Sequence, residues 1–434
     1  MTSVVAESAR TTLAGARLKA IIGGSLGNFV EWYDWFAYAS FSLYFGKTFF
    51  PNGGELDRRL ETAAVFAVGF FARPIGAWLM GVYADHRGRK AALVLSVSLM
   101  CAGSLIIALA PGYAQVGPLA PVILIAARLV QGLSLGGEYG ASAVYVAEMA
   151  GRARRGFHSS FLFVTLMVGQ LAALGVLIVL QALLTPAQIS AFGWRIAFFI
   201  GAALALVVWF IQAGLEETSL FRAEDATARR ASTVGALLRR QPKEAAMVFV
   251  LSGAGALTFY SFTTYMPKFL TGTAHFSRPA ATEISAASLM VLMVVQPFFG
   301  WLGDTIGRKR LLIFAFAAGA LTTWPILTTL AATRDPLAAL ALISAALICL
   351  AAYTAVNGLV KSELFPTELR GLGVALPYAL ANAIFGGTAE LVAEAFKKVG
   401  TERGFFVYVS VIAAAACLVA VRMRDTQKTS LIAD

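Results

Sequence analysis

Charged residues are scarce in this chain. Asp, Glu, Lys and Arg make up 14 % of its 434 residues, against roughly 25 % in a typical soluble protein. Hydrophobic residues make up 58 %, so the chain has too little charge to cover the surface of two or three soluble domains. Disorder is excluded as well, because disordered chains are poor in apolar residues and rich in charge. The composition predicts an all-α protein that crosses a membrane many times.

Cysteine and histidine are also rare, with three of each. The cysteines lie in separate apolar runs, a spacing that fits neither a metal site nor a disulfide framework. The sequence contains no phosphate-binding loop, no His-Glu-x-x-His and no Gly-x-Ser-x-Gly. We therefore expect neither an enzyme nor an ATP-driven pump, and we expect no metal and no cofactor.

Basic residues outnumber acidic ones, which gives a formal net charge of +11. In a soluble protein this excess would suggest nucleic acid as a partner. Here most Lys and Arg residues lie in short clusters between apolar runs, where they set topology and meet anionic lipid. We therefore expect a lipid bilayer as the partner, and no nucleic acid.

Twelve apolar segments are long enough to be membrane-spanning helices, which need about 20 residues each. They fall into an N-terminal bundle at 20–214 and a C-terminal bundle at 244–423, divided by a polar linker at 215–243 and flanked by tails at 1–19 and 424–434. The expected spans are 20–45, 60–84, 91–111, 119–148, 158–182, 194–214, 245–270, 284–303, 311–331, 337–361, 371–393 and 404–422.

Lys and Arg are distributed unevenly between the two sides of these spans. The side that carries both tails and the linker holds more than twice as many as the other side. Because cytoplasmic loops are enriched in basic residues, both termini are predicted to be cytoplasmic.

An internal repeat relates the two halves. The segment GVYADHRGRK at 81–90 matches GWLGDTIGRK at 300–309 in Gly, Asp, Gly, Arg and Lys at one constant offset. A second pair lies below spans four and ten, where Glu148 precedes Arg155 and Glu363 precedes Arg370 by the same interval. Two matched pairs indicate two homologous six-helix halves. Transporters are often built in this way, with the substrate site at the midplane between the repeats.

Further motifs are similar to those of a known family. The repeated loop resembles that of the major facilitator superfamily, and several segments resemble its metabolite:proton symporter family. These segments are GNFVEWYD at 27–34, FARPIG at 71–76, RLVQGLSLGGEYG at 128–140, FYSFTTYM at 259–266 and ALANAIFGGTAE at 379–390.

The resemblance implies a twelve-helix carrier in the cell inner membrane that takes up a small organic anion together with protons. It points most closely to a dicarboxylate such as α-ketoglutarate. Citrate, shikimate or a zwitterionic osmolyte remain alternatives, as does a sensor that binds substrate without transporting it. A channel fits less well, because it would more typically show a repeated pore motif or a ring of charges. We expect a monomer.

Several charges fall inside the expected spans, where they are costly and usually functional. Glu31 and Asp34 lie on one face of span one and are candidates for the proton-coupling carboxyl. Arg73 lies roughly 15 Å from the nearer end of span two and could anchor a substrate carboxylate through its guanidinium. The alternative for the two acids is structural pairing with Arg73 or Arg128, and the alternative for Arg73 is structural pairing with Glu31 or Asp34. Arg128 of span four is a further coupling candidate, because RLVQG at 128–132 resembles a superfamily motif associated with proton transfer. Structural pairing is the alternative for Arg128. Glu138 of the same span is the next candidate for the coupling site.

Polar residues in the second half could hydrogen-bond a carboxylate or keto oxygen. The candidates are Tyr260, Tyr265, Tyr353, Asn357 and Asn382. The alternative for each of these side chains is a purely structural role in packing its helix against a neighbouring helix. Lys268 and Lys361 are expected near span ends, where a lysine can reach the interface.

The repeated loops also predict a gate on the cytoplasmic side. Asp85 should meet the start of span eleven near Gly371, and Asp304 should meet the start of span five near Gly156. Arg89 should pair with Glu148, and Arg308 with Glu363. These contacts would stabilise the outward-facing state, and neutralising Asp85 should shift the population inward. The alternative is that the charges only set topology.

Overall fold

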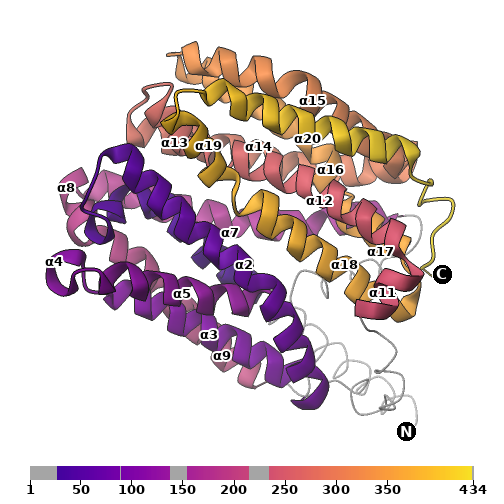
Figure 1. The fold of residues 1–434 in the computed structure, drawn as a ribbon, viewed down its shortest axis with the longest axis horizontal. Helices are drawn as coiled ribbons and strands as arrows, with labels where there is room; N and C mark the ends of the chain where they lie inside the picture. Colours follow the sequence, from indigo (N-terminus) through magenta and orange to yellow (C-terminus); the bar gives the residue numbers. More distant parts are fainter. Residues whose placement is uncertain (1–26, 88, 137–153, 215–233, 433–434) are drawn as a thin grey trace, which may run out of the picture.

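The structure is a computed structural model, and it describes residues 27–87, 89–136, 154–214 and 234–432. These residues fold into helices arranged as two bundles that lie side by side (Figure 1). The first bundle, coloured indigo to magenta, contains the first six expected spans, and the second, coloured salmon to yellow, contains the last six. The protein is an all-helical, multi-pass membrane protein.

Each expected span has a helical counterpart. In the first bundle the long helices cover 27–49, α2 Glu55–Arg87, α3 Arg89–Leu109, α5 Leu119–Leu135, α7 Arg155–Leu183 and α9 Trp194–Ala213. Short elements between them are α4 Tyr113–Val116, α8 Pro186–Gln188 and the π-helix η2 Ile189–Gly193. Among the described residues, ten helical segments are long and apolar enough to cross a membrane, and the helix over 27–49 and the shorter apolar helix α5 correspond to the other two.

The second bundle is more interrupted than the sequence predicted. Its elements are α11 Val234–Arg240, α12 Pro242–Phe262, α13 Met266–Gly272, α14 Arg278–Ile306, α15 Arg308–Ala332, α16 Pro336–Thr354, α17 Asn357–Leu364, α18 Thr367–Ala381, η4 Asn382–Gly386, α19 Ala389–Lys398 and α20 Glu402–Arg422. Span seven divides into α12 and α13 because Pro267 has no N–H to continue the ladder and restricts the residue before it. Span eleven contains η4, a π-helical turn of the kind common at functional sites.

Small residues let helices approach closely within and between the bundles. Gly132 of α5 packs against α2, where an added Cβ would lie 2.8 Å from the Cβ of Ala72. Close approach of this kind is typical of small residues at helix contacts within membranes. Between the bundles, a Cβ on Gly300 of α14 would lie 2.6 Å from the carbonyl oxygen of Gly156 of α7. The two bundles therefore meet along α7 and α14, and also where α2 faces α18, η4 and α19.

Large apolar side chains remain exposed on the outer faces of the bundles. Leu183 and Leu321 are 74 % and 77 % exposed, and Val294 is 66 % exposed. In water this exposure would be a liability, whereas against lipid tails it satisfies the hydrophobic requirement of a membrane span.

The segment after α20 packs back onto the bundle. Gln427 Nε2 donates to the carbonyl oxygen of Asp304 at 2.9 Å, and Arg370 Nη2 donates to that of Leu431 at 2.7 Å. Ile432 is buried against Leu359. The C-terminal segment thus lies at the end of the molecule that carries Asp304, which we call the Asp304 end. The opposite end, which carries α13, is called the Lys268 end.

Candidate functional site

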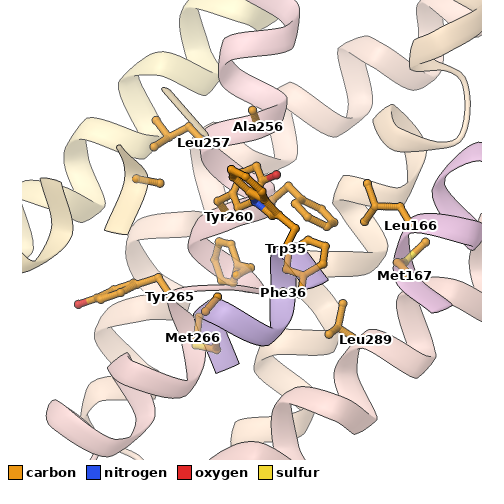
Figure 2. Packing of buried hydrophobic residues seen from close by; sticks show 14 of the residues in the cluster. Trp35, Phe36, Leu166, Met167, Ala256, Leu257, Tyr260, Tyr265, Met266 and Leu289 are labelled. Atoms are coloured by element: carbon orange, nitrogen blue, oxygen red, sulfur yellow. The ribbon is translucent and has the colours of Figure 1, made fainter. Parts of the chain in front are cut away.

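Arg73 lies at the centre of the molecule, on α2 where this helix faces the second bundle. Its guanidinium lies over the rings of Trp35 and Phe70, at 4.0 Å from each centroid. The hydroxyl of Tyr260 of α12 lies beside it, so one polar contact already crosses between the bundles. Figure 2 shows Trp35, Phe36 and Tyr260 gathered together at this place.

The side chain of Arg73 is only 5 % exposed, and its Nε and Nη2 have no hydrogen-bond partner in the part of the chain that the structure describes. No ion pair links it to Glu31 or Asp34 among these residues. A buried guanidinium with unused donors is a suitable anchor for a carboxylate, because Arg can bind both carboxylate oxygens at once.

Arg128 of α5 supplies a second buried guanidinium beside the first. It lies 3.9 Å from the centroid of Trp35 and 4.4 Å from that of Tyr38. Its Nη1 donates to Oε1 of Gln131 at 2.8 Å, whereas its Nε and Nη2 have no partner within the described ranges. Both cations thus lie over the same indole ring, where their positive charge is stabilised by the ring face.

The two acids of the helix over 27–49 lie inside the first bundle. Asp34 is fully buried and accepts hydrogen bonds from Ser104 of α3 and Gln131 of α5. Arg128 therefore reaches Asp34 through Gln131. Glu31, one turn away, accepts a hydrogen bond from Ser96 at 2.7 Å. The structure thus links Asp34 to Arg128 through Gln131 and holds Glu31 in a neighbouring cluster with Ser96, while Glu138 lies outside the described residues.

The polar candidates of the second bundle separate into different places. Tyr260 contacts Arg73, and the Tyr353 hydroxyl donates to Oδ1 of Asn357 at 3.2 Å. Tyr265 lies apart, because its ring packs on Phe405 and its hydroxyl points away from the Trp35 and Tyr260 group (Figure 2). Asn382 donates to the carbonyl oxygen of Tyr378 in its own helix, at 3.0 Å. The structure therefore does not bring Tyr265 to Arg73, and the amide of Asn382 is hydrogen-bonded within its own helix.

At the Asp304 end, the contacts predicted from the repeat are present in the second half. The carboxylate of Asp304 accepts from the backbone N–H groups of Gly156 at 2.8 Å and Phe157 at 3.0 Å, at the start of α7. Arg308 pairs with Glu363 and also donates to Asp304 at 3.1 Å. The mirrored contacts cannot be compared, because the side chains of Asp85 and Arg89 and all of Glu148 lie outside the described residues.

The Lys268 end also carries contacts between the bundles. Lys398 of α19 lies 2.8 Å from Asp57 of α2, and Arg59 of α2 donates to the carbonyl oxygen of Lys268 at 3.3 Å. Lys268 itself is buried and forms an ion pair with Glu390 of α19. The expectation that Lys268 reaches the interface is therefore wrong, because a buried carboxylate holds its ammonium inside the bundle.

Comparison with known proteins identifies the chain. The profile of the sugar (and other) transporter family matches residues 20–245 and 224–433. The chain belongs to this family. It is thus a transporter and not an enzyme, and it shares its fold with a proton:xylose symporter of the major facilitator superfamily.

Relatives of the transporter include several carriers of organic acids. It is 46 % identical over 412 residues to an alpha-ketoglutarate permease of Escherichia coli, covering 95 % of both chains, and 33 % identical to a citrate-proton symporter of Klebsiella pneumoniae, covering 88 % of this chain and 86 % of the relative. The crystal structure of a D-xylose-proton symporter superimposes with a TM-score of 0.77 over 95 % of this chain and 99 % of that one. At 19 % identity this last likeness shows the shared fold alone.

Sequence reasoning missed the burial of one further cation. Lys361 lies in the last turn of α17, near a span end as expected, but it is only 1 % exposed and lies 4.2 Å from the ring centroid of Tyr378. Tyr378 in turn lies within electrostatic range of Arg73. The regular spacing of Tyr353, Asn357 and Lys361 along one helical stripe was the available signal, since such a stripe indicates one common face.

Proposed function

We propose that the transporter imports a small dicarboxylate, with α-ketoglutarate as the leading substrate, together with protons. The observation that carries this proposal is the identity of 46 % over 95 % of both chains to the alpha-ketoglutarate permease. The geometry supports it, because Arg73 and Arg128 offer buried guanidinium donors that no other described group uses. Citrate is the second candidate, on the likeness to the citrate-proton symporter.

The proposal assigns residues to substrate binding, to proton coupling and to the two gates. Arg73 anchors one substrate carboxylate and Tyr260 contributes a hydroxyl beside it, with Tyr353 and Asn357 as further polar groups of the second bundle. At least one of Glu31 and Asp34 carries the coupling proton, and Arg128, which keeps its positive charge, is linked to Asp34 through Gln131. The Asp304 end faces the cytoplasm together with both termini, as the excess of Lys and Arg indicates. The contacts at the two ends then alternate as gates on either side of the substrate.

Uptake into proteoliposomes tests the proposed function directly. Labelled α-ketoglutarate should accumulate inside when the outside is acidic, and an excess of unlabelled α-ketoglutarate should compete better than citrate, shikimate or glycine betaine. If labelled citrate accumulates and labelled α-ketoglutarate does not, citrate replaces α-ketoglutarate as the proposed substrate. Binding without any uptake would instead support the sensor.

Removing the charge of Asp304 tests the cytoplasmic gate. In Asp304→Asn the side chain loses its charge at the helix N-terminus, so we expect the closed Asp304 end to be destabilised by about 0.5–2 kcal/mol. Cysteine labelling at this end should become faster, whereas the affinity for substrate in the open state should not change.

A matched control is Glu368→Gln, which removes an exposed acid at the start of α18, at the same end. Labelling in this variant should equal that of the parent protein. If Asp304→Asn labels no faster than Glu368→Gln and still transports, then Asp304 only sets topology.

A further inference from the structure

Two acids lie one turn apart on α19, inside the Lys268 end. Glu390 and Glu394 are both buried. Glu390 has a charge partner, because Lys268 of α13 forms a buried ion pair with it. The negative charge of Glu390 is thus compensated within the second bundle.

Glu394 has no comparable partner. Its exposed fraction is 0 %, and neither carboxylate oxygen accepts a hydrogen bond from any residue that the structure describes. No Lys or Arg within the same ranges forms an ion pair with it. Buried polar groups are almost always hydrogen-bonded, and an ionised carboxylate without donors costs several kcal/mol. The neutral acid avoids this cost.

The charged and titratable groups around Glu394 include three cations, each of which contacts an acceptor other than Glu394. These groups come from four segments and are Arg59, Tyr265, Lys268, Glu390, Lys397 and Glu402. Arg59 donates to Glu55 at 2.6 Å and to the carbonyl oxygen of Lys268. Lys397 donates to the hydroxyl of Thr273 at 2.7 Å and lies 3.9 Å from Glu402. The cations near Glu394 therefore bind other acceptors in this closed arrangement.

The burial of Glu394 involves both bundles. Arg59 belongs to α2 of the first bundle, and Lys398, at the end of α19, is held to Asp57 of α2. When this end opens, α2 must separate from α19, and water gains access to the neighbourhood of Glu394. A hydrated carboxyl ionises readily, whereas the buried one does not.

We propose that Glu394 binds one proton when the Lys268 end closes and releases it when this end opens. The proton comes from water on that side, forms an O–H bond with the carboxylate, and returns to water after the bond breaks. The proposal rests on the alternation of the two gates stated above, and it adds a proton site that is separate from Asp34. Because the closed form holds one more proton than the open form, closure is favoured as the pH falls.

Spin labels on the two bundles can measure this linkage. Glu61→Cys on α2 and Arg403→Cys on α20 place labels at exposed positions at the Lys268 end, after Cys101, Cys349 and Cys417 are replaced by Ser. Double electron–electron resonance on the full chain in nanodiscs, without substrate, then gives the ratio of closed to open molecules between pH 5 and pH 8. For one linked proton, this ratio should rise by up to about tenfold for each unit by which the pH falls.

Glu394→Gln should remove this proton while keeping the shape of the neutral acid. We expect its closed fraction to be high at every pH. For each unit by which the pH falls, the ratio of closed to open molecules should rise less than in the parent, and the difference should be up to about tenfold. The matched control is Glu283→Gln, an exposed acid at the start of α14, which should keep the parent's slope. An equal slope in Glu394→Gln and the parent, or a parent ratio that does not change with pH, would overturn the proposal.

Infrared spectroscopy provides a second measurement that does not depend on the labels. The carbonyl band of a protonated carboxyl group should be weaker in Glu394→Gln than in the parent at a pH that favours the closed form, and an unchanged band would contradict the proposal. Neither measurement uses a substrate or a pH gradient across a membrane. The proton site can therefore fail while uptake of α-ketoglutarate succeeds, and uptake can fail while the proton site stands.

Discussion

Replacing Arg73 by Lys is expected to weaken substrate binding by about 1–3 kcal/mol, which is roughly 5- to 150-fold in Kd. Lys keeps the positive charge but loses the planar fork that can bind both oxygens of a carboxylate. It also loses the stacking of the guanidinium on Trp35 and Phe70, both at 4.0 Å. Equilibrium binding of labelled α-ketoglutarate to the purified transporter would measure the change.

The control for this experiment is Arg334→Lys, at an exposed position where Arg334 donates to the backbone carbonyls of Ala331 and Thr333. Its Kd should equal that of the parent. Thermal unfolding of both variants would show whether the loss of aromatic stacking has damaged the fold. A folded Arg73→Lys transporter that binds with the parent's Kd would refute the anchor.

Asp34→Asn is expected to abolish uphill accumulation of substrate. The amide keeps nearly the same shape but cannot take up and release a proton, so a pH difference no longer drives transport. One pH unit can drive accumulation by up to about tenfold per coupled proton, and this should fall to equal concentrations inside and outside. Exchange of labelled for unlabelled substrate should continue, because exchange requires no net movement of protons.

Glu31→Gln is the necessary companion, since Glu31 lies one turn from Asp34 on the same helix and accepts a hydrogen bond from Ser96. If Asp34→Asn still concentrates substrate, Glu31→Gln should lose accumulation in its place while retaining exchange. The control is Glu244→Gln, which removes a partly exposed acid from the first turn of α12 and should accumulate substrate normally. If both Asp34→Asn and Glu31→Gln still concentrate substrate, the coupling proton lies elsewhere. In that case Glu394 and Glu138 are the next acids to replace.

Some long-range contacts could be predicted because the two halves repeat one another. The matching loops placed Asp304 against the start of α7 near Gly156 and paired Arg308 with Glu363, and both contacts are present. The reason is that a repeated motif in a symmetric fold occupies equivalent positions relative to its neighbours. The prediction therefore needed no knowledge of helix distances.

The partners of the other buried charges could not be predicted in this way. Lys268 and Lys361 were expected to reach the membrane interface, but the first is held by Glu390 and the second lies over Tyr378. A position near a predicted helix end did not show that another helix would cover it. Similarly, Tyr260 and Tyr265 share one short segment, but the break before Pro267 turns them to different places.

The amino-acid sequence by itself determined the membrane class, the twelve spans, the internal repeat and the set of charges inside the spans. These properties are readable because hydrophobic run length, loop charge and repeated motifs are arranged along the chain. Only the tertiary structure decided which of those charges have partners: Asp34 with Ser104 and Gln131, Lys268 with Glu390, and Glu394 with no donor among the described residues. The physical reason is that pairing and burial depend on distances between helices far apart in the chain, including α2 and α19 from opposite halves, and no local pattern encodes these distances.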